Sequence, residues 1–512
     1  MLSDVLTVTI NGLDADLVHV ETDTKSGLPS LTIVGLPDLT VKESKERIHS
    51  AIINSGYHFP SKRITINLAP AATRKLGSHF DLPLAAGVFA SSVNIDPAML
   101  KGTAFLGELS LDGRLNRLEN CLGLIIGLKQ NNITRIFIPE ANVPEASIVK
   151  GIEIFPVSVF SDVADHLTGQ EQIEPISSPI MVHDKGLHDK SLSMPDFIDV
   201  VGQERAKRAF QISAAGKHDL SMIGPPGTGK TMLARRMPSI LPELSYDEML
   251  EVTKIHSIAG EPLPCGLIET RPFRAPHHST TAQALVGGGS RPKPGEISLA
   301  HLGVLFLDEL PEFPRHSIDT LRQPLEDGFV SISRAASRLK YPCELILVTA
   351  MNPCPCGYYG HPSRNCTCTQ SHRMNYFNKV SGPLRDRIDV SIDIGPVEYE
   401  YLGKAEVLRG KSSEDLRKGV QRVFELQEDR YKGEEVKCNA KLSPPMIEKY
   451  CKLNTESERL LESAYNKYGF SARAGTKVKK VARTIADLEG ADDISAEHVA
   501  EAISYRVPGN FV

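Results

Sequence analysis

The 512-residue sequence predicts an α/β protein whose central part is built on a parallel sheet. Three short apolar segments support this prediction, and each is followed at once by glycines or polar side chains. They are SMI at 221–223, GVLFL at 303–307 and ELILVTAM at 344–351. Short apolar runs bounded by turn residues are typical of strands buried on both faces. Ligand sites in such sheets lie at the carboxyl ends of the strands.

Length and composition limit the possible classes of protein. A chain this long exceeds one hydrophobic core, so we expect two to four domains. The amino terminus lacks a basic segment followed by an apolar run, and no apolar run approaches the roughly 18 residues of a membrane span. We therefore expect a cytoplasmic protein with reduced thiols and no membrane contact. The net charge of −5 gives no global basic field, so any DNA binding must depend on local basic side chains.

The pattern along the chain predicts three domains. Residues 1–168 contain strand patterns in SLTIVGLP and RITINLAP, a helical pattern between them, and the hairpin signal Asn11-Gly12. A polar, aperiodic linker at 169–192 follows. Strand and helix patterns alternate over 193–395, and residues 396–512 are helical.

A phosphate-binding loop follows the first central strand. Its pattern is Gly-x-x-x-x-Gly-Lys-Thr, and the helical segment MLARRM comes next. Glycines let backbone N–H groups surround phosphates, and the following helix presents its positive amino terminus. Lys230 is expected to bridge the β- and γ-phosphates of ATP and Thr231 to hold Mg²⁺. The predicted nucleotide contacts are Gly224, Pro225, Pro226, Gly227, Thr228, Gly229, Lys230 and Thr231.

The other two central strands supply the remaining chemistry. GVLFL delivers Asp308 and Glu309 to its carboxyl end. Asp308 suits Mg²⁺ through water, and Glu309 suits polarisation of the attacking water. ELILVTAM ends at Asn352, whose amide is placed to orient that water.

Taken together, these motifs resemble the AAA+ ATPases, and among them the Mg-chelatase-like proteins of the ComM/YifB type. The resemblance covers nearly the whole chain and is most specific in FRAPHHSTTAQALVGGGSRPKPGEISLAHLGVLFLDELPEF and in AMNPCPCGY. It implies an AAA+ core at 193–395 and a helical lid of the Mg-chelatase C-terminal type at 396–512. It also implies that residues 1–168 form a Lon-protease-like domain with the fold of ribosomal protein S5 domain 2.

Site roles follow from the same resemblance. Asn352 is expected to be the sensor-1 residue, Arg387 the arginine finger acting on a neighbouring subunit, and Arg473 the sensor-2 residue. Val201 and Gly202 are expected to line the adenine.

The sequence departs from the family patterns beside both arginines. After Arg473, Gly475 and Thr476 stand where bulkier residues are usual. The family's PLLDRID reads PLRDRID here, so Arg385 is a second candidate for the finger. In the first domain a protease needs a serine activated by a lysine. Ser78 is present, but LDGRLNRLENC offers no matching lysine. We therefore expect that domain to be a non-proteolytic platform.

Two segments, RAPHHSTTAQALVGGGSRPKPGE and GFVSISRAASRLKYPC, look like hairpin insertions that point into the pore of a ring. Their basic residues are the expected contacts to the DNA backbone. They are Arg291, Lys293, Arg334, Arg338 and Lys340.

The resemblance favours a hexameric DNA motor that drives branch migration in homologous recombination and natural transformation. A chelatase-type ATPase that remodels a protein partner and an ATP-dependent protease are the alternatives.

Four of the nine cysteines lie within an insertion at 354–368. Cys354 and Cys356 are two residues apart, as are Cys366 and Cys368, and such pairs face the same way on extended backbone. Two pairs on neighbouring arms of a loop can form the S₄ set that Zn²⁺ favours. A structural zinc site is therefore predicted, with a disulfide pair as the alternative.

Overall fold

A computed structural model describes most of the chain. For residues 333, 334, 337 and 338, only the backbone is described. The described ranges are 2–93, 95–177, 194–261, 266–289, 292–334, 337–396 and 410–506. The chain divides into two compact units, Met1–Asp189 with Thr253–Ile268, and Lys190–Val252 with Glu269–Val512.

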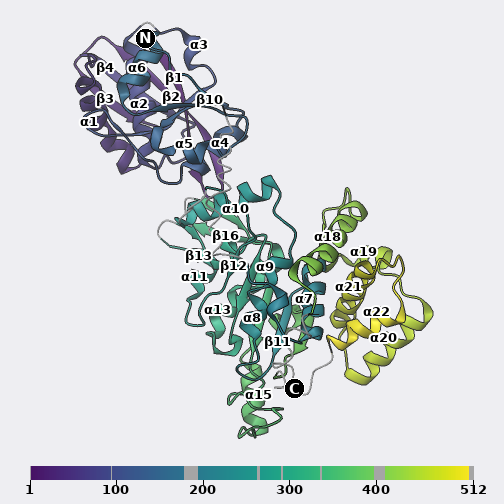
Figure 1. Ribbon diagram of the computed structural model, residues 1–512. Coiled ribbons are helices and arrows are strands. Elements are labelled where there is room, and N and C mark those ends of the chain that lie inside the picture. Colours follow the sequence, from purple (N-terminus) through teal and green to yellow (C-terminus); the bar gives the residue numbers. More distant parts are fainter. Residues whose placement is uncertain are drawn as a thin grey trace. The chain divides into compact units, whose positions relative to one another are not determined.

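The first unit is built on an eight-stranded mixed sheet with the strand order β10-β9-β8-β5-β1-β2-β4-β3 (Figure 1). The predicted hairpin is confirmed, since β1 and β2 pair antiparallel across a turn in which Gly12 has a φ of 70°. A small ribbon, β6 with β7, lies outside the sheet. The strands are β1 (Leu2–Asn11), β2 (Asp14–Lys25), β3 (Ser30–Val34), β4 (Arg63–Ala69), β5 (Thr103–Phe105), β6 (Glu108–Leu109), β7 (Leu115–Asn116), β8 (Arg135–Pro139), β9 (Glu153–Val157) and β10 (Ile176–Ser177).

The core of this unit is apolar and aromatic. Helix α2 is buried along almost its whole length against β1 and β2. Ser78 opens the short 3₁₀ turn before it, whereas the buried Lys75 ammonium donates a hydrogen bond to the carbonyl of Pro70. The helices are α1 (Leu39–Asn54), α2 (Asp81–Ser92), α3 (Pro97–Leu100), α4 (Cys121–Gln130), α5 (Val143–Ala146) and α6 (Phe160–Thr168).

The second unit contains the parallel sheet that the sequence predicts. Five strands lie in the order β12-β15-β18-β11-β19, and all neighbouring pairs are parallel. Every residue of β11, β15 and β18 is buried, as expected for strands covered on both faces. The strands are β11 (Leu220–Ile223), β12 (Phe273–Arg274), β15 (Val304–Leu307), β18 (Ile346–Met351) and β19 (Val390–Asp393).

Helices and two antiparallel ribbons surround this sheet. Both segments predicted as hairpins contain a ribbon: β13 (Gly287–Gly288) pairs with β14 (Lys293–Pro294), and β16 (Phe329–Arg334) pairs with β17 (Ser337–Pro342). The helices are α7 (Glu204–Gly216), α8 (Lys230–Ala234), α9 (Met237–Ile240), α11 (Ala282–Val286), α12 (Glu296–Leu299), α13 (Arg315–Thr320), α14 (Arg322–Asp327), α15 (Gln370–Asn378) and α16 (Gly382–Arg387). Helix α10 (Tyr246–Ala259) belongs to this unit up to Val252 and to the first unit from Thr253.

The carboxyl-terminal part of the second unit is helical and packs beside α7 (Figure 1). Apolar residues of α18, α21 and α22 belong to the same hydrophobic core as those of β11 and β18. This shared core fixes the helices against the side of the sheet. They are α18 (Ser413–Arg430), α19 (Pro444–Tyr450), α20 (Thr455–Tyr468), α21 (Ala472–Glu489) and α22 (Ala496–Ser504).

Candidate active site

The phosphate loop connects β11 to α8 at the carboxyl end of the sheet. Two of its glycines are required by geometry. A Cβ at Gly224 would lie 2.2 Å from the carbonyl oxygen of Ile394, and Gly229 has a φ of +86°, which L residues with side chains rarely adopt. The loop can therefore pass close to β19 and turn into α8 with its backbone N–H groups available to an anion.

Lys230 joins this loop to the neighbouring strand. Its ammonium donates hydrogen bonds to the carbonyls of Gly224 (2.6 Å) and Pro225 (2.9 Å) and to the side-chain oxygen of Asn352 (3.2 Å). Burial lowers the pKa of Lys230, although Asp308 and Glu309 act in the opposite direction. The predicted phosphate ligand and the predicted sensor amide thus lie side by side.

The predicted magnesium ligands are also in contact. The hydroxyl of Thr231 donates to Oδ2 of Asp308 at 2.7 Å. Glu309 has a φ of +51°, in the left-handed region, and its exposed side chain lies directly after the buried strand β15. A hydroxyl and a carboxylate oxygen on adjacent elements are the donor types that Mg²⁺ prefers, so this pair fits the metal.

His278 is a neighbour of Glu309 that the sequence reasoning missed. Its Nδ1 lies 3.6 Å from Oε2 of Glu309, and its ring lies against that of His277, with centroids 3.9 Å apart and ring planes tilted by 36°. The residue follows β12, the strand next to β15 in the sheet. The signal in the sequence was the dipeptide His-His between the phosphate loop and the acidic strand.

Val201 and Gly202 lie just before Gln203, the residue that caps the amino end of α7. Gln203 donates a hydrogen bond from its amide to the carbonyl of Gly395, just beyond β19. Since β19 pairs with β11, this segment lies near the carboxyl end of the same sheet as the phosphate loop.

The two predicted arginines lie at the opposite end of the sheet. Arg387 and Arg473 line one cavity of about 280 Å³ with Asp219 and Asp389, which immediately precede β11 and β19. Strand β11 has four residues, so at about 3.3 Å per residue the two residues that flank it, Asp219 and Gly224, are roughly 16 Å apart. In one chain, neither arginine is therefore brought to the phosphate loop.

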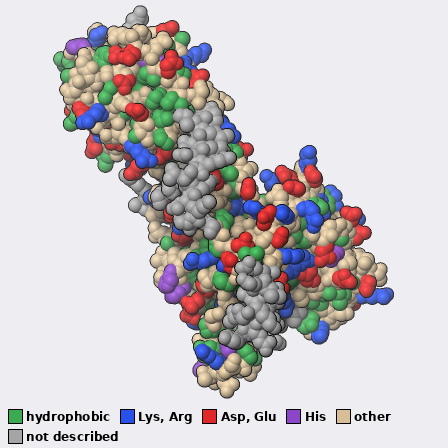
Figure 2. Space-filling view, viewed as in Figure 1, with side chains coloured by type: hydrophobic (Ala, Val, Ile, Leu, Met, Phe, Trp, Pro, Cys, Tyr) green, Lys and Arg blue, Asp and Glu red, His purple; other side chains and the backbone are tan. Residues whose placement is uncertain are grey.

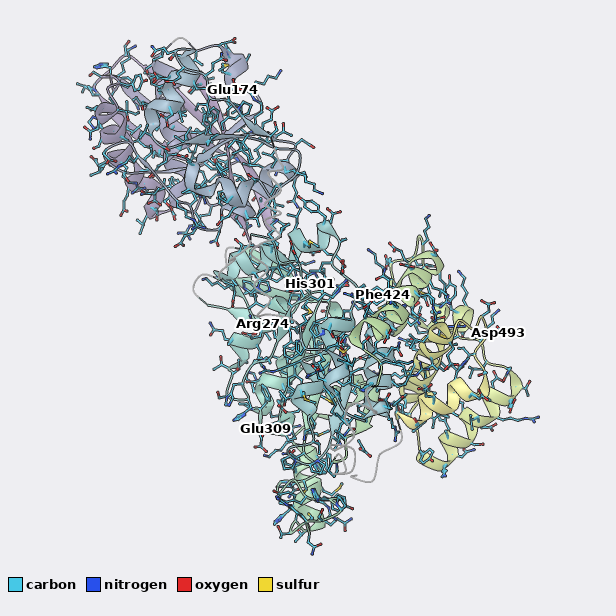
Figure 3. All side chains as sticks on the ribbon, viewed as in Figure 1. Glu174, Arg274, His301, Glu309, Phe424 and Asp493 are labelled. Carbon is cyan, nitrogen blue, oxygen red and sulfur yellow. The ribbon has the colours of Figure 1, made fainter. Side chains whose placement is uncertain are left out.

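Figure 3 shows this separation along one strand. His301 precedes β15 and Glu309 follows it, and the two labelled side chains lie at opposite ends of the core. Phe424, which lines the cavity, is labelled on α18, away from Glu309.

The two candidates for the arginine finger differ in their surroundings. Nε of Arg387 lies 3.0 Å from Oδ2 of Asp219, but its orientation does not make a hydrogen bond. Arg385 is exposed and does not line the cavity. Burial raises the pKa of Asp219, and Arg387 acts against this effect.

The four cysteines of the insertion converge as the spacing predicts. The Sγ atoms of Cys354, Cys356, Cys366 and Cys368 all lie within 4.8 Å of one another, and three of the pairs are 3.3–3.7 Å apart. In a tetrahedral site with Zn–S of about 2.3 Å, sulfurs are about 3.8 Å apart. The set therefore fits a zinc ion.

This cysteine cluster touches the nucleotide loop. A Cβ at Gly357 would lie 2.8 Å from Cδ of Pro226, so the two loops are in close contact. On its other side, the cluster leads into α15, where Phe377 packs with Ile223 and Met351. The helix that follows the cluster is thus packed against the ends of β11 and β18.

Only some of the predicted DNA contacts can be placed. The exposed Lys293 lies on β14, and the exposed Lys340 on β17 has its amine 4.7 Å from the ring of Phe329. The backbones of Arg334 and Arg338 lie in the β16–β17 ribbon, but their side chains and all of Arg291 are outside the described residues.

Figure 2 shows acidic and basic side chains interspersed around α18, with no extended surface of one charge in the described part of this view. Within the described ranges, no helix is both long enough and apolar enough to cross a bilayer.

Comparison with protein families gives three matches, all to magnesium chelatase. Residues 196–402 match the family "Magnesium chelatase, subunit ChlI", residues 20–142 match "Subunit ChlI of Mg-chelatase", and residues 410–506 match the C-terminal family of the same subunit.

Individual relatives extend this similarity to nearly the whole chain. The competence protein ComM of Haemophilus influenzae is 43% identical over 97% of this chain and 95% of its own length. The uncharacterized protein YifB of Escherichia coli is 42% identical over 99% of this chain and 97% of its own. The magnesium-chelatase subunit ChlI of Trieres chinensis is 26% identical over 32% of this chain and 54% of its own.

Proposed function

This chain belongs to the ComM/YifB group of magnesium-chelatase-like AAA+ ATPases, and from that membership we propose that it is a hexameric, ATP-driven motor that acts on DNA. The proposed activity is branch migration of DNA junctions, in homologous recombination and natural transformation. The word "competence" in the name of the H. influenzae relative supports the second setting.

The observation that carries the proposal is the division of the site between the two ends of one sheet. Lys230, Asp308 and Glu309 lie at the carboxyl end, whereas Arg387 and Arg473 lie at the amino end. An ATP molecule bound at the loop can meet such arginines only if a second subunit brings its amino end to the site. Repetition of this contact around an axis closes a ring.

Each residue at the carboxyl end has a separate role. Bound Mg²⁺, held by Thr231 and Asp308, would neutralise charge on the phosphates. Lys230 turns from the carbonyls of Gly224 and Pro225 to the phosphates. Glu309 polarises the attacking water, and Asn352 orients it.

In the proposed ring, the neighbouring subunit brings the amino end of its own sheet to this ATP. Its Arg387 and Arg473 supply fixed positive charge to the transferred phosphoryl group. Val201 and Gly202 are the proposed contacts to adenine. Arg387 is the better candidate for the finger than Arg385, because it lines the same cavity as Arg473.

DNA is the proposed substrate of the motor because two ribbons, β13–β14 and β16–β17, carry the basic residues of the second unit's insertions. Pore ribbons contact phosphates and leave the bases unread, so we expect binding without sequence specificity. The proposed contacts are Arg291, Lys293, Arg334, Arg338 and Lys340.

We also propose that the cysteine cluster holds a structural Zn²⁺. Four thiolates close the coordination sphere and leave no open position for a substrate. The contact between Gly357 and Pro226 supports a role in fixing the phosphate loop and the end of β18 that carries Asn352.

The deciding experiment measures ATP hydrolysis with single-stranded DNA, with a synthetic four-way junction and without DNA. We expect DNA to stimulate hydrolysis and ATP to drive strand exchange on the junction. A rate of ATP hydrolysis that neither DNA changes would favour the alternative, an ATPase that remodels a protein partner, as the name of the chelatase relatives suggests.

A further inference from the structure

Lys477 connects the two elements that carry the arginines. It lies on α21, one helical turn after Arg473. Its ammonium is 2.6 Å from Oδ1 of Asp389 and donates to the carbonyls of Arg387 and Ile388. These carbonyls end α16, where a helix leaves its last C=O groups without partners of its own.

Asp389, the ion-pair partner of Lys477, is also held by buried residues of the core. Nδ1 of His218 lies 2.9 Å from Oδ2 of Asp389, and the remaining ring nitrogen is 2.8 Å from the hydroxyl of Thr484 on α21. Burial disfavours the charged form of Asp389, but Lys477 and His218 outweigh it and hold its pKa well below the usual value. The carboxylate is thus fixed from both the sheet and the helical region.

We infer that Lys477 is a positioning residue that holds Arg387 and Arg473 as one unit for presentation to the neighbouring subunit's nucleotide. This inference rests on the proposed action of the two arginines between subunits. Lys477 does not itself reach a phosphate, because its three contacts are the groups that end α16 and begin β19.

One consequence distinguishes this role from general support of the fold. A subunit without Lys477 keeps its own phosphate loop, Asp308 and Glu309. Its arginines, however, are no longer held in the position that the neighbouring subunit's nucleotide requires. Lys477→Met should therefore lower kcat by roughly ten- to a hundredfold, the scale expected for small misplacements of a catalytic group, and leave KM for ATP unchanged. Lys477→Arg should restore most of the rate.

Mixed rings give the decisive readout. Rings of Lys477→Met with Lys230→Ala should regain activity, because an intact loop then meets correctly positioned arginines at some interfaces. Rings of Lys477→Met with Arg387→Ala should show no recovery above the low rate of Lys477→Met alone, since every interface has a defective arginine side. Lys479→Met, on the same helix and with no ion pair in the described structure, is the matched control and should hydrolyse ATP normally.

The opposite pattern overturns the inference. If Lys477→Met recovers with Arg387→Ala but not with Lys230→Ala, the lysine supports its own subunit's loop. If Arg387→Ala with Lys230→Ala also fails to recover in rings shown to be mixed by mass, the proposed action between subunits is wrong as well. Should Lys477→Met fold poorly, the pair Lys477→Met with Asp389→Asn removes both charges, and the same pattern is expected.

Discussion

The two ends of the five-stranded sheet use the same residue types in different ways. At the carboxyl end, Asp308 is half-buried and Glu309 is exposed, so both remain available to metal and water. At the amino end, Asp219 and Asp389 are buried and face Arg387 and Lys477. The first pair of acids contacts a hydroxyl and an imidazole and is open to solvent, whereas the second pair holds basic groups in place.

This contrast fits the proposal that each chain contributes two halves of different ATP sites. On the proposed roles, the carboxyl end supplies the phosphate loop and the acidic pair, whereas Arg387 and Arg473 line a cavity at the amino end. Mutations at the two ends should therefore separate binding from turnover.

The largest expected effect is at the carboxyl end. Lys230→Ala removes the charge that meets the phosphates, so nucleotide binding should fall below detection in a fluorescent-ATP titration. Glu309→Gln keeps the shape of the side chain but not its basicity, so it should bind ATP normally and hydrolyse it far more slowly. Normal hydrolysis by Glu309→Gln would falsify its assignment as the water-polarising residue.

The next largest effect is expected from a substitution that affects only the amino end of the sheet. Arg387→Ala should bind ATP with normal affinity and lose about 10³-fold or more in kcat, because arginine fingers contribute roughly 10³–10⁵ in turnover. Arg385→Ala should lose little, since that side chain does not line the cavity. The reverse ranking of the two variants would move the finger to Arg385.

Rings that mix a variant of the carboxyl end with a variant of the amino end test whether the two ends of different subunits form one ATP site. Arg387→Ala and Lys230→Ala are each inactive alone, but in mixed rings some interfaces join an intact loop to an intact arginine. Partial recovery of ATP hydrolysis is expected. No recovery, with mixed assembly established by native mass measurement, counts against action between subunits.

Local patterns predicted the carboxyl end well. The loop, the acidic pair and Asn352 each follow a buried strand directly, so their order in the sequence already places them at one end of a parallel sheet. The convergence of the four cysteines was predictable for the same reason, because residues i and i+2 share a face. These features depend on a few neighbouring residues.

The amino end could not be predicted in the same way. Lys477 meets Asp389 only after the helical region has packed on the sheet through a shared apolar core. Neither residue stands in a recognisable spacing with the other. His278 was missed for a related reason, since its contact with Glu309 depends on β12 lying next to β15.

A smaller effect is expected from the cysteine cluster, which lies beside the phosphate loop at the carboxyl end. Cys366→Ser with Cys368→Ser should lose zinc, lower the melting temperature modestly and reduce kcat severalfold, with little change in ATP affinity. The reason is that a loose insertion no longer holds the loop at Pro226. Metal content should be measured on protein purified without a histidine tag.

A control separates the metal from the contact. Gly357→Ala keeps all four thiols but places a methyl group against Pro226 at a φ of +85°. It should retain zinc and still lose turnover. Substoichiometric zinc with four titratable thiols in the unmodified protein would show that the cluster holds no metal.

The smallest effect concerns DNA and should spare both ends of the sheet. Arg334→Ala with Arg338→Ala should weaken DNA binding equally for all sequences and leave ATP hydrolysis without DNA unchanged, because neither strand of the β16–β17 ribbon supplies a residue of the phosphate loop or of the cavity that Arg387 and Arg473 line. Each lost phosphate contact should reduce the slope of log affinity against log salt by about one. Lys42→Ala with Lys62→Ala removes the same charge from exposed positions of the first unit and should leave the slope unchanged. If the slope of log affinity against log salt is the same for both double variants, the DNA contacts lie outside this ribbon. If only the ribbon variant lowers the slope, the ribbon belongs to the DNA-binding surface, and this result does not depend on the chemistry at either end of the sheet.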